Sequence, residues 1–255
     1  EISTRDWEFR RVLFRSIEAD VGDTLTRLNA ILEPEKRPEW QAKIAEIRRC
    51  GDERRAECVG RLDPYDIIDY VSDSCPDETP IVTDVGQHQM WVAQRYRFRS
   101  PRTFITSGGL GAMGFGMGAA IGSCVASGRR AVLFTGDGSF GMNLNELATA
   151  VSQNLPLSVI IMNNGVLGMV RQWQNMFYNE HYSQTTLNRK TNFVALAEAF
   201  GAAGMRAENI DEFKACFDKS LGCEGPAVID CMIDKDEKVF PMIPPNASVD
   251  KIICN

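Results

Sequence analysis

The stretch that decides the fold covers residues 131–165, AVLFTGDGSFGMNLNELATAVSQNLPLSVIIMNNG. Two short apolar runs, 131–135 and 157–162, flank a segment with helical character near 143–152. A tight turn reverses the chain and so joins antiparallel strands, whereas parallel strands need a longer connection, usually a helix. Two strands with a helix between them are therefore expected to run parallel. Parallel strands are covered by helices on both faces, and so they are apolar throughout. We therefore predict an α/β domain with a doubly wound, mostly parallel sheet.

The same alternation of strands and helices continues outward from this unit. It predicts further strands at 81–86, 103–106 and 226–233, and further helices at 64–72, 192–200 and 211–221. In sheets of this kind, ligands bind outside the carboxyl ends of the strands. We therefore expect the functional residues in the loops that follow Val82, Ile105, Thr135 and Met162.

The first sixty residues do not show this alternation of strands and helices. Residues 1–16 show no period, and we interpret them as a truncation scar or an assembly artefact. Residues 22–32, behind a possible Asp23 cap, and 38–49 predict two amphipathic helices, and the charged run 50–61 predicts a linker. Two helices cannot bury a core of their own. The expected domains are 17–60, the end of a middle domain with its linker; 61–240, a cofactor-binding domain; and 241–255, a C-terminal tail.

Composition excludes several classes of function. The hydrophobic fraction of 44% and the charged fraction of 24% are ordinary for a soluble globular protein. A net charge of -6 argues against nucleic acid as a partner. The sequence has no apolar stretch near the ~20 residues of a bilayer span, so we expect no membrane partner. Eight cysteines without a CxxC pair and two histidines offer no zinc-site spacing.

A glycine-rich segment, SGGLGAMGFGMG at 107–118, follows the strand predicted at 103–106. Backbone without Cβ atoms can approach a phosphate closely, and the start of the next helix offers free amides. Gly109, Gly111 and Gly114 also satisfy the GxGxxG pattern of dinucleotide-binding proteins. The segment alone leaves three alternatives open: a diphosphate site, a nicotinamide-dinucleotide site, and a tight packing turn.

A second motif is more specific. Asp137 lies between two glycines directly after one predicted strand, and Asn163 and Asn164 end the next, with 24 residues (139–162) between Gly138 and Asn163. Carboxylate and amide oxygens are hard ligands of the kind that Mg²⁺ prefers, together with phosphate oxygens and water. The two motifs therefore predict a site for Mg²⁺ and a diphosphate.

GDG followed by NN at this distance is similar to the thiamine diphosphate (ThDP) signature. The stretches DVGQHQMW (84–91), TFITSGGLGAMGFGMGAAIG (103–122), GDGSF (136–140) and NNGVLGMVRQWQ (163–174) resemble the large subunit of acetolactate synthases. The resemblance runs from about Ile17 to Asn255, and ITSGGLGAMGFG resembles the biosynthetic, FAD-containing kind. It implies ThDP, Mg²⁺ and FAD as cofactors, with FAD bound mainly by a middle domain of which this chain carries only the end.

The resemblance also implies roles for individual residues. The Mg²⁺ ligands would be Asp137, Asn164 and the backbone carbonyl of Val166. Met113 would prop the cofactor in its bent form. The other residues that would contact the cofactor are Gly86, Gln87, His88, Gly111, Gly136, Gly138, Ser139 and Met169.

Met169 and Trp173 lie four residues apart, so both can face one cleft if this segment is a helix. Positions that match them in the resembled family line the substrate channel, and the tryptophan favours 2-ketobutyrate over pyruvate. An apolar wall distinguishes one methylene by only ~1 to 3 kcal/mol, which suits such a preference. The alternative is that both residues belong to the core. His181 receives no role.

The resemblance implies decarboxylation of pyruvate and its condensation with pyruvate or 2-ketobutyrate, in branched-chain amino-acid synthesis. It also implies a homodimer or homotetramer with a shared active site, a small regulatory subunit, and a cytoplasmic or organellar location. The activating glutamate would lie in an N-terminal domain, so no catalytic residue is expected in this chain. The alternative is a Mg²⁺-ThDP-binding module without turnover.

Overall fold

The computed structural model describes residues 17–55, 62–188, 190–244, 246–248 and 251–254, with backbone only for 50–55. The described residues form two compact units, one ending at Arg48 and the other beginning at Arg49. The boundaries expected at residues 60 and 240 remain predictions.

The first unit contains α2 (Val21–Ile31) and most of α3 (Pro38–Arg55). Both helices were predicted, but the expected cap and end were wrong. Asp20, not Asp23, caps α2, and its carboxylate accepts a hydrogen bond from the Asp23 amide at 3.0 Å. The helix α3 continues through Cys50–Arg55, where we expected a linker, because the run Asp52–Arg55 tolerates a helix despite Gly51. The rest of that linker, residues 56–61, lies outside the described residues.

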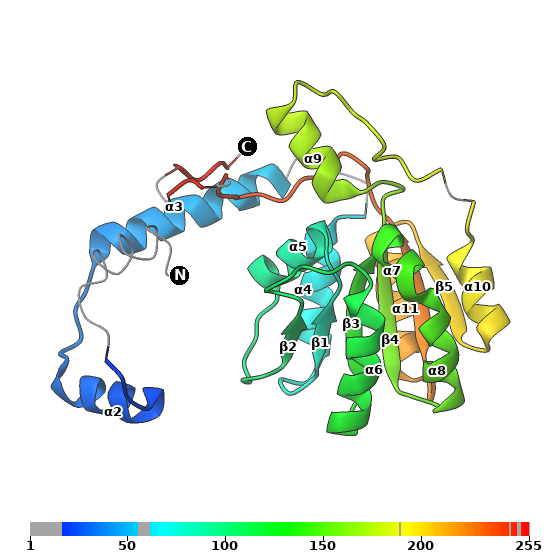
Figure 1. The fold of residues 1–255 in the computed structure, drawn as a ribbon, viewed down its shortest axis with the longest axis horizontal. Helices are drawn as coiled ribbons and strands as arrows, with labels where there is room; N and C mark the ends of the chain where they lie inside the picture. Colours follow the sequence, from blue (N-terminus) through cyan, green and yellow to red (C-terminus); the bar gives the residue numbers. More distant parts are fainter. Residues whose placement is uncertain (1–16, 56–61, 189, 245, 249–250, 255) are drawn as a thin grey trace, which may run out of the picture. The chain divides into compact units, whose positions relative to one another are not determined.

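The second unit is built on six parallel strands (Figure 1). They are β1 (Ile81–Thr83), β2 (Phe104–Thr106), β3 (Ala131–Gly136), β4 (Leu157–Asn163), β5 (Ala203–Ala207) and β6 (Ala227–Met232). Their order in the sheet is β2-β1-β3-β4-β6-β5. Between β1 and β3 the winding of the chain reverses direction, and in such sheets this reversal point is where ligands bind. The predicted fold class is confirmed.

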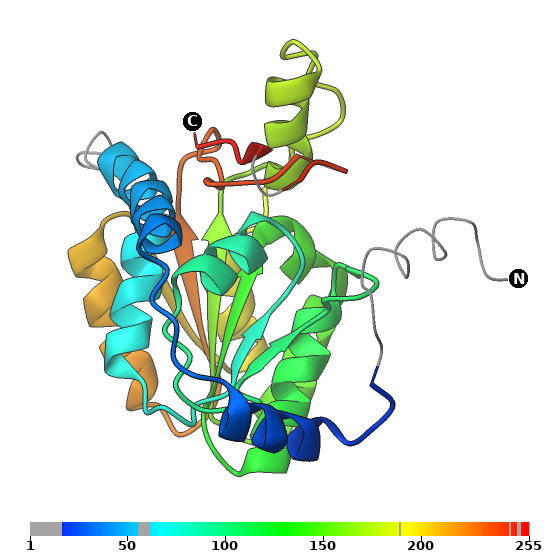
Figure 2. The ribbon, with the colours of Figure 1, turned by 90° about the vertical axis from the view of Figure 1, so that its left-hand side faces the viewer.

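Helices cover both faces of the sheet (Figures 1 and 2). The helices α4 (Pro64–Ser74), α5 (Gln87–Arg95) and α11 (Ile210–Leu221) pack with Phe134 and Ile160 on one face. On the other face, α6 (Phe115–Ser127), α7 (Asp137–Asn143), α8 (Leu147–Ser152) and α10 (Phe193–Phe200) pack with Leu133 and Ile161. Adjacent strand residues thus serve opposite layers, which is why the central strands β3 and β4 are mostly apolar on both faces.

Three local predictions were wrong. The strand expected at 81–86 ends at Thr83, because the Asp84 side chain turns back to bind backbone amides. The strand β5 was not predicted, since Gly204 and the exposed Arg206 interrupt its apolar pattern. The helix expected at 143–152 is divided: α7 begins at Asp137 itself, and a 3₁₀ turn (Leu144–Glu146) separates it from α8.

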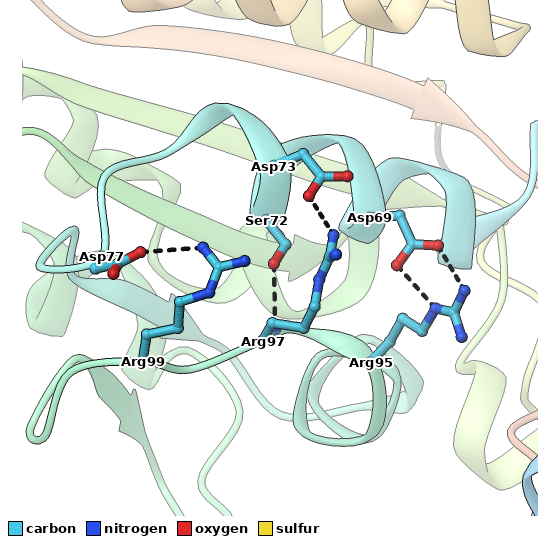
Figure 3. A network of polar contacts seen from close by, with 7 residues as sticks. All are labelled: Asp69, Ser72, Asp73, Asp77, Arg95, Arg97 and Arg99. Atoms are coloured by element: carbon cyan, nitrogen blue, oxygen red, sulfur yellow. Dashed lines mark hydrogen bonds and ion pairs between the residues drawn. The ribbon is translucent and has the colours of Figure 1, made fainter.

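A ladder of ion pairs joins α4 and its following turn to α5 and the chain beyond it (Figure 3). Asp69 binds Arg95 through both carboxylate oxygens at 2.8 and 2.7 Å, Asp73 binds Arg97, and Asp77 binds Arg99 at 3.0 Å. The Asp73 and Asp77 pairs are exposed, and exposed pairs contribute up to ~1 kcal/mol each. The ladder fastens the carboxyl end of α5, whose other end enters the candidate site.

None of the described helices is long and apolar enough to cross a membrane.

Candidate functional site

A cavity of about 300 Å³ lies at the carboxyl ends of β1 to β4. Loops after all four strands contribute to it, as the sheet topology predicts. It contains every residue expected to bind the cofactor or the metal: Gly86, Gln87, His88, Gly111, Met113, Gly136, Asp137, Gly138, Ser139, Asn164, Val166 and Met169. Residues separated by more than eighty positions in the sequence are therefore brought into one site.

Asp84 joins two walls of this cavity. Its carboxylate is 2% exposed and accepts hydrogen bonds from the amides of Val85 at 2.7 Å, Gly114 at 2.9 Å and Gly116 at 3.0 Å. Burial raises the pKa of this carboxyl group, and the three amides oppose that rise. Asp84 thus ties the end of β1 to the glycine-rich loop and places Met113, the residue before Gly114.

Replacing Asp84 by asparagine should lower the free energy of unfolding by about 2 kcal/mol. Asparagine keeps one acceptor oxygen, for Val85 and Gly114, but it turns an NH₂ group toward the Gly116 amide and leaves that amide unsatisfied. Urea denaturation measures the loss. Asp73→Asn, which removes one exposed ion pair, is the control and should cost under about 1 kcal/mol. Equal losses for the two variants would contradict the role of Asp84.

The helices that border the cavity begin without a side-chain cap. This holds for α5, α7 and α9 (Gly168–Phe177), which follow β1, β3 and β4. By contrast, α4, α10 and α11 are capped by Asp63, Asn192 and Asn209. Uncapped amides at a helix N-terminus favour an anion, both as donors and through the helix dipole. The end of the sheet that holds the cavity is therefore suited to a diphosphate.

Oxygen atoms suited to a metal lie beside these helix ends. Asp137 is the first residue of α7, and Asn164 follows β4. The bridge between Val166 and Thr186 uses the Gly165 carbonyl and the Leu167 amide, so the Val166 carbonyl points away from that bridge. The described residues contain no group of three or more His, Cys, Asp or Glu side chains that could hold a metal. The carboxylate of Asp137, the side-chain oxygen of Asn164 and the carbonyl of Val166 are oxygen donors of the kind that Mg²⁺ prefers.

His88 adds an unsatisfied polar atom to the cavity wall. Its Nε2 is buried and has no hydrogen-bond partner in the described structure. Burial lowers the pKa of His88 to about 3, with partial opposition from a hydrogen bond to the Asp84 backbone. The imidazole is therefore neutral at pH 7, and a bound group could satisfy Nε2.

The buried imidazole predicts acid sensitivity. The ordinary pKa of 6.5 applies to the unfolded chain, which takes up a proton below that pH while the folded chain does not. His88 therefore lowers the free energy of unfolding as the pH falls from 6.5 toward 3. Between pH 7 and 5.5 the unsubstituted chain should lose about 1 kcal/mol more than His88→Gln in urea denaturation. His181→Gln, a change at the surface, should keep the full pH dependence; equal slopes for His88→Gln would contradict this prediction.

Two glycines allow close approach within the site. A Cβ on Gly168 would lie 1.9 Å from Oε1 of Gln87, and one on Gly86 would lie 2.7 Å from Cε1 of His88. Gly86 also has a φ of 157°, at the edge of the region that favours glycine. The start of α9 thus packs directly against the start of α5, where Gln87 lies.

Met169 and Trp173 face a common groove, as their spacing predicts. This groove of about 680 Å³ runs along α9 and is lined by Met169, Val170, Trp173, Gln174, Phe177, Tyr178, Asn179 and His181. Met169 also lines the main cavity, whereas Trp173 does not. Trp173 packs edge-on against Phe177, with 6.1 Å between the ring centroids. Met169 and Val170 line both hollows, so the groove adjoins the main cavity, and its use as a substrate channel remains a prediction.

The family model for the C-terminal TPP-binding domain of thiamine pyrophosphate enzymes matches residues 84–231. The chain belongs to this family. The match covers the carboxyl ends of β1, β3 and β4, where the predicted cofactor and metal residues lie. The name of the family specifies thiamine pyrophosphate, another name for ThDP, and so favours this cofactor over the nicotinamide alternative.

Relatives within the thiamine pyrophosphate enzymes confirm the resemblance to acetolactate synthases. The chain is 42% identical to the acetolactate synthase isozyme 1 large subunit of Escherichia coli (strain K12), over 91% of this chain and 42% of that protein. It is 37% identical to the mitochondrial acetolactate synthase catalytic subunit of Saccharomyces cerevisiae, over 93% of this chain and 36% of that protein. The chain thus spans about two fifths of the length of these relatives.

A solved structure of this family is similar in fold. Benzoylformate decarboxylase from Polynucleobacter necessarius superposes with a TM-score of 0.63 at 27% identity, over 69% of this chain and 34% of that one. This likeness supports the observed α/β fold.

Proposed function

We propose that this chain supplies the diphosphate- and Mg²⁺-binding part of an acetolactate synthase. The observation that carries the proposal is the convergence of Asp137, Asn164, Val166 and the uncapped starts of α5, α7 and α9 on one cavity. The identity of 37 to 42% to acetolactate synthase subunits supports this activity among those of the family.

The reaction would be the decarboxylation of pyruvate and its condensation with a second 2-keto acid. Pyruvate as the second substrate gives 2-acetolactate, and 2-ketobutyrate gives 2-aceto-2-hydroxybutyrate. ThDP supplies the carbon nucleophile and the electron sink for both steps when it is bound. The protein binds, orients and shields the reacting groups.

Each part of the cavity would have a separate task. Asp137, Asn164 and the Val166 carbonyl would hold Mg²⁺, and the amides of α5 and α7 would bind the diphosphate. Ser139 donates a hydrogen bond from Oγ to the Val85 carbonyl at 2.8 Å and so fixes the start of α7 against the loop of α5. Met113 would fill space beneath the cofactor, which suits a flexible thioether. Met169 and Trp173 would form the apolar wall that favours the larger keto acid.

The remaining parts of the proposal concern the assembly. FAD would be bound mainly by residues outside this chain, and a second subunit would complete each active site in a homodimer or homotetramer. The large-subunit name of the E. coli relatives supports a small regulatory subunit as partner. The cytoplasm is the proposed location, with an organelle as the alternative, since some relatives carry mitochondrial or chloroplastic names.

The test is calorimetric titration of the purified 255-residue chain with ThDP, in Mg²⁺ and in EDTA. Binding that requires Mg²⁺ supports the proposal. Equal binding in both buffers, or none in either, would overturn it. Nicotinamide dinucleotide serves as the control ligand and should not bind.

A second candidate is a binding module without turnover, and the composition of the cavity favours it for the chain alone. Among its described lining residues, Asp137 is the one carboxylate, and there is no glutamate. The carboxylate that activates ThDP would therefore have to come from elsewhere. Production of acetolactate from pyruvate by the 255-residue chain with ThDP and Mg²⁺ would refute this candidate.

A further inference from the structure

Beyond the last strand, an extended segment is bound by side chains through five successive carbonyl groups. We call residues 237–241 the strap. The donors come from α4, α5 and α9: Gln87 to Glu237 (2.8 Å), Trp91 to Lys238 (3.4 Å), Gln172 to Val239 (3.0 Å), Tyr65 to Phe240 (3.0 Å) and Gln94 to Pro241 (2.8 Å). Three of these donors lie on one face of α5, because they are spaced four and three residues apart.

Gln172 lies at the centre of this arrangement and is 2% exposed. Its Nε2 donates to the Val239 carbonyl at 3.0 Å, and its Oε1 accepts from the Val239 amide at 2.9 Å. These two bonds fix the orientation of the Gln172 amide, because a reversed amide would place its oxygen against the Val239 carbonyl and its NH₂ against the Val239 amide. The same Oε1 also accepts a hydrogen bond from Nε2 of Gln87 at 2.9 Å. The strap therefore fixes the orientation of Gln172, and Gln172 fixes that of Gln87.

Gln87 uses both of its amide hydrogens inside the protein. One goes to Oε1 of Gln172 and the other to the Glu237 carbonyl, at 2.9 and 2.8 Å. Its own Oε1 faces Nδ2 of Asn164 at 3.4 Å. A diphosphate accepts hydrogen bonds, and the side chain of Gln87 has no N–H group left to donate. Its contribution to the cofactor must therefore come from its backbone or through Asn164.

Asn164 is the last of three side-chain amides that are hydrogen-bonded in series, after Gln172 and Gln87. Its Nδ2 donates to Gln87, while its Oδ1 accepts the Val166 amide at 3.1 Å. An asparagine with its amide reversed would present hydrogens, not oxygen, on the side of Val166. Because a metal ion needs the oxygen, the direction of this amide decides whether Asn164 can act as a ligand.

We propose that Gln172 and Gln87 form an amide relay that positions Asn164 for Mg²⁺, starting from the backbone of Val239. The relay rests on the proposed function, since it concerns the same metal site. Gln172 and Gln87 are positioning residues in it, and the strap is the fixed point that sets their direction. In this proposal the side chain of Gln87 serves the metal ligand, and the expected contact of Gln87 with the cofactor would be made by its backbone.

The test is a double-mutant cycle with Gln87→Met and Gln172→Met, which keep the length of each side chain. The Mg²⁺ affinity of the 255-residue chain is measured by calorimetry at saturating ThDP. Each variant should weaken it about tenfold, which is about 1.4 kcal/mol. The double variant should be no weaker than Gln87→Met alone, because both changes break one relay. The relay would be overturned if the two losses of Mg²⁺ affinity multiplied in the double variant, or if Gln172→Met left the Mg²⁺ affinity unchanged.

Matched controls separate the relay from simple loosening of the strap. Gln94→Met and Tyr65→Phe each remove one bond to the strap but do not contact Asn164, so both should bind Mg²⁺ within about twofold of the unsubstituted chain. A tenfold loss in either would overturn the relay in favour of a general effect of the strap. If the unsubstituted chain shows no Mg²⁺-dependent ThDP binding, the proposed function fails, and the relay fails with it.

If Gln172→Met does not fold, Gln172→Glu tests the relay in a different way, because this variant should retain Mg²⁺ affinity. At this buried position the glutamic acid is expected to be protonated. It then keeps an acceptor oxygen for Gln87 and the Val239 amide, and its hydroxyl donates to the Val239 carbonyl, so the relay predicts Mg²⁺ affinity within about twofold of the unsubstituted chain. Gln87→Met should still lose about tenfold. A tenfold loss in Gln172→Glu, or no loss in Gln87→Met, would overturn the proposal.

Discussion

Asp137→Ala should abolish Mg²⁺-dependent binding of ThDP, with a loss of affinity of at least about a hundredfold. The carboxylate is 5% exposed at the first position of α7, beside uncapped amides. Without it, the proposed metal site keeps only a side-chain amide and a backbone carbonyl, both neutral. Removing a charged ligand to a divalent cation costs several kcal/mol in a site of low dielectric. Calorimetry in Mg²⁺ and in EDTA measures the effect.

The control for this substitution is Asp211→Ala, which removes a carboxylate from the exposed first turn of α11. It should leave ThDP affinity unchanged. Circular dichroism of Asp137→Ala should match that of the unsubstituted chain, because alanine suits the first turn of α7. Undiminished ThDP affinity in a folded Asp137→Ala chain would overturn the metal assignment.

Gly168→Ala should have the largest effect of any single methyl group in the site. The new Cβ would lie 1.9 Å from Oε1 of Gln87 and 2.8 Å from Nδ2 of Asn164. Gln87 cannot move aside without breaking its bonds to Gln172 and Glu237. Two buried hydrogen bonds would be lost, so the free energy of unfolding should fall by about 2 to 4 kcal/mol. ThDP affinity should fall at least about tenfold, because Asn164 is displaced as well.

Gly122→Ala is the matched control, since it adds the same methyl group within α6. Apart from its chain neighbours and the backbone of its own helix, no atom lies within 4 Å of a Cβ at that position. Alanine favours a helix over glycine by up to about 1 kcal/mol, so this variant should be slightly more stable. Urea denaturation compares the two. Gly168→Ala with unchanged stability and ThDP affinity would contradict the close packing of α9 against α5.

The sequence predicted most of the fold because most of its elements are locally encoded. The strands β3, β4 and β6 are mostly apolar, with Thr135, Ser158 and Asp230 buried among the apolar residues, and such runs favour a parallel sheet covered on both faces. The strand β5 escaped prediction because Met205 is its one large apolar residue, between Gly204 and the exposed Arg206. The short helices α5 and α7 escaped prediction because glycine precedes each of them, in place of the Asn caps that mark α10 and α11.

Part of the candidate site could also be predicted from the sequence. Asp137 and Asn164 were found because each directly follows a strand, and parallel strands bring such positions together. Asp84 also follows a strand, and that position was the signal that could have identified it. Gln172 carried no such signal, since its partner Val239 lies 67 residues away in the sequence. Only the folded arrangement of α9 and the strap brings the two residues together.

The missing side-chain caps of α5, α7 and α9 link the folding stability of the protein to its ligand. Each missing cap forgoes about 0.5 to 2 kcal/mol of folding stability. On the proposed function, the bound diphosphate restores that stability, because a ligand of the native state shifts the folding equilibrium by mass action. The folded fraction, and with it resistance to proteolysis, would then rise and fall with the supply of the vitamin from which ThDP is made.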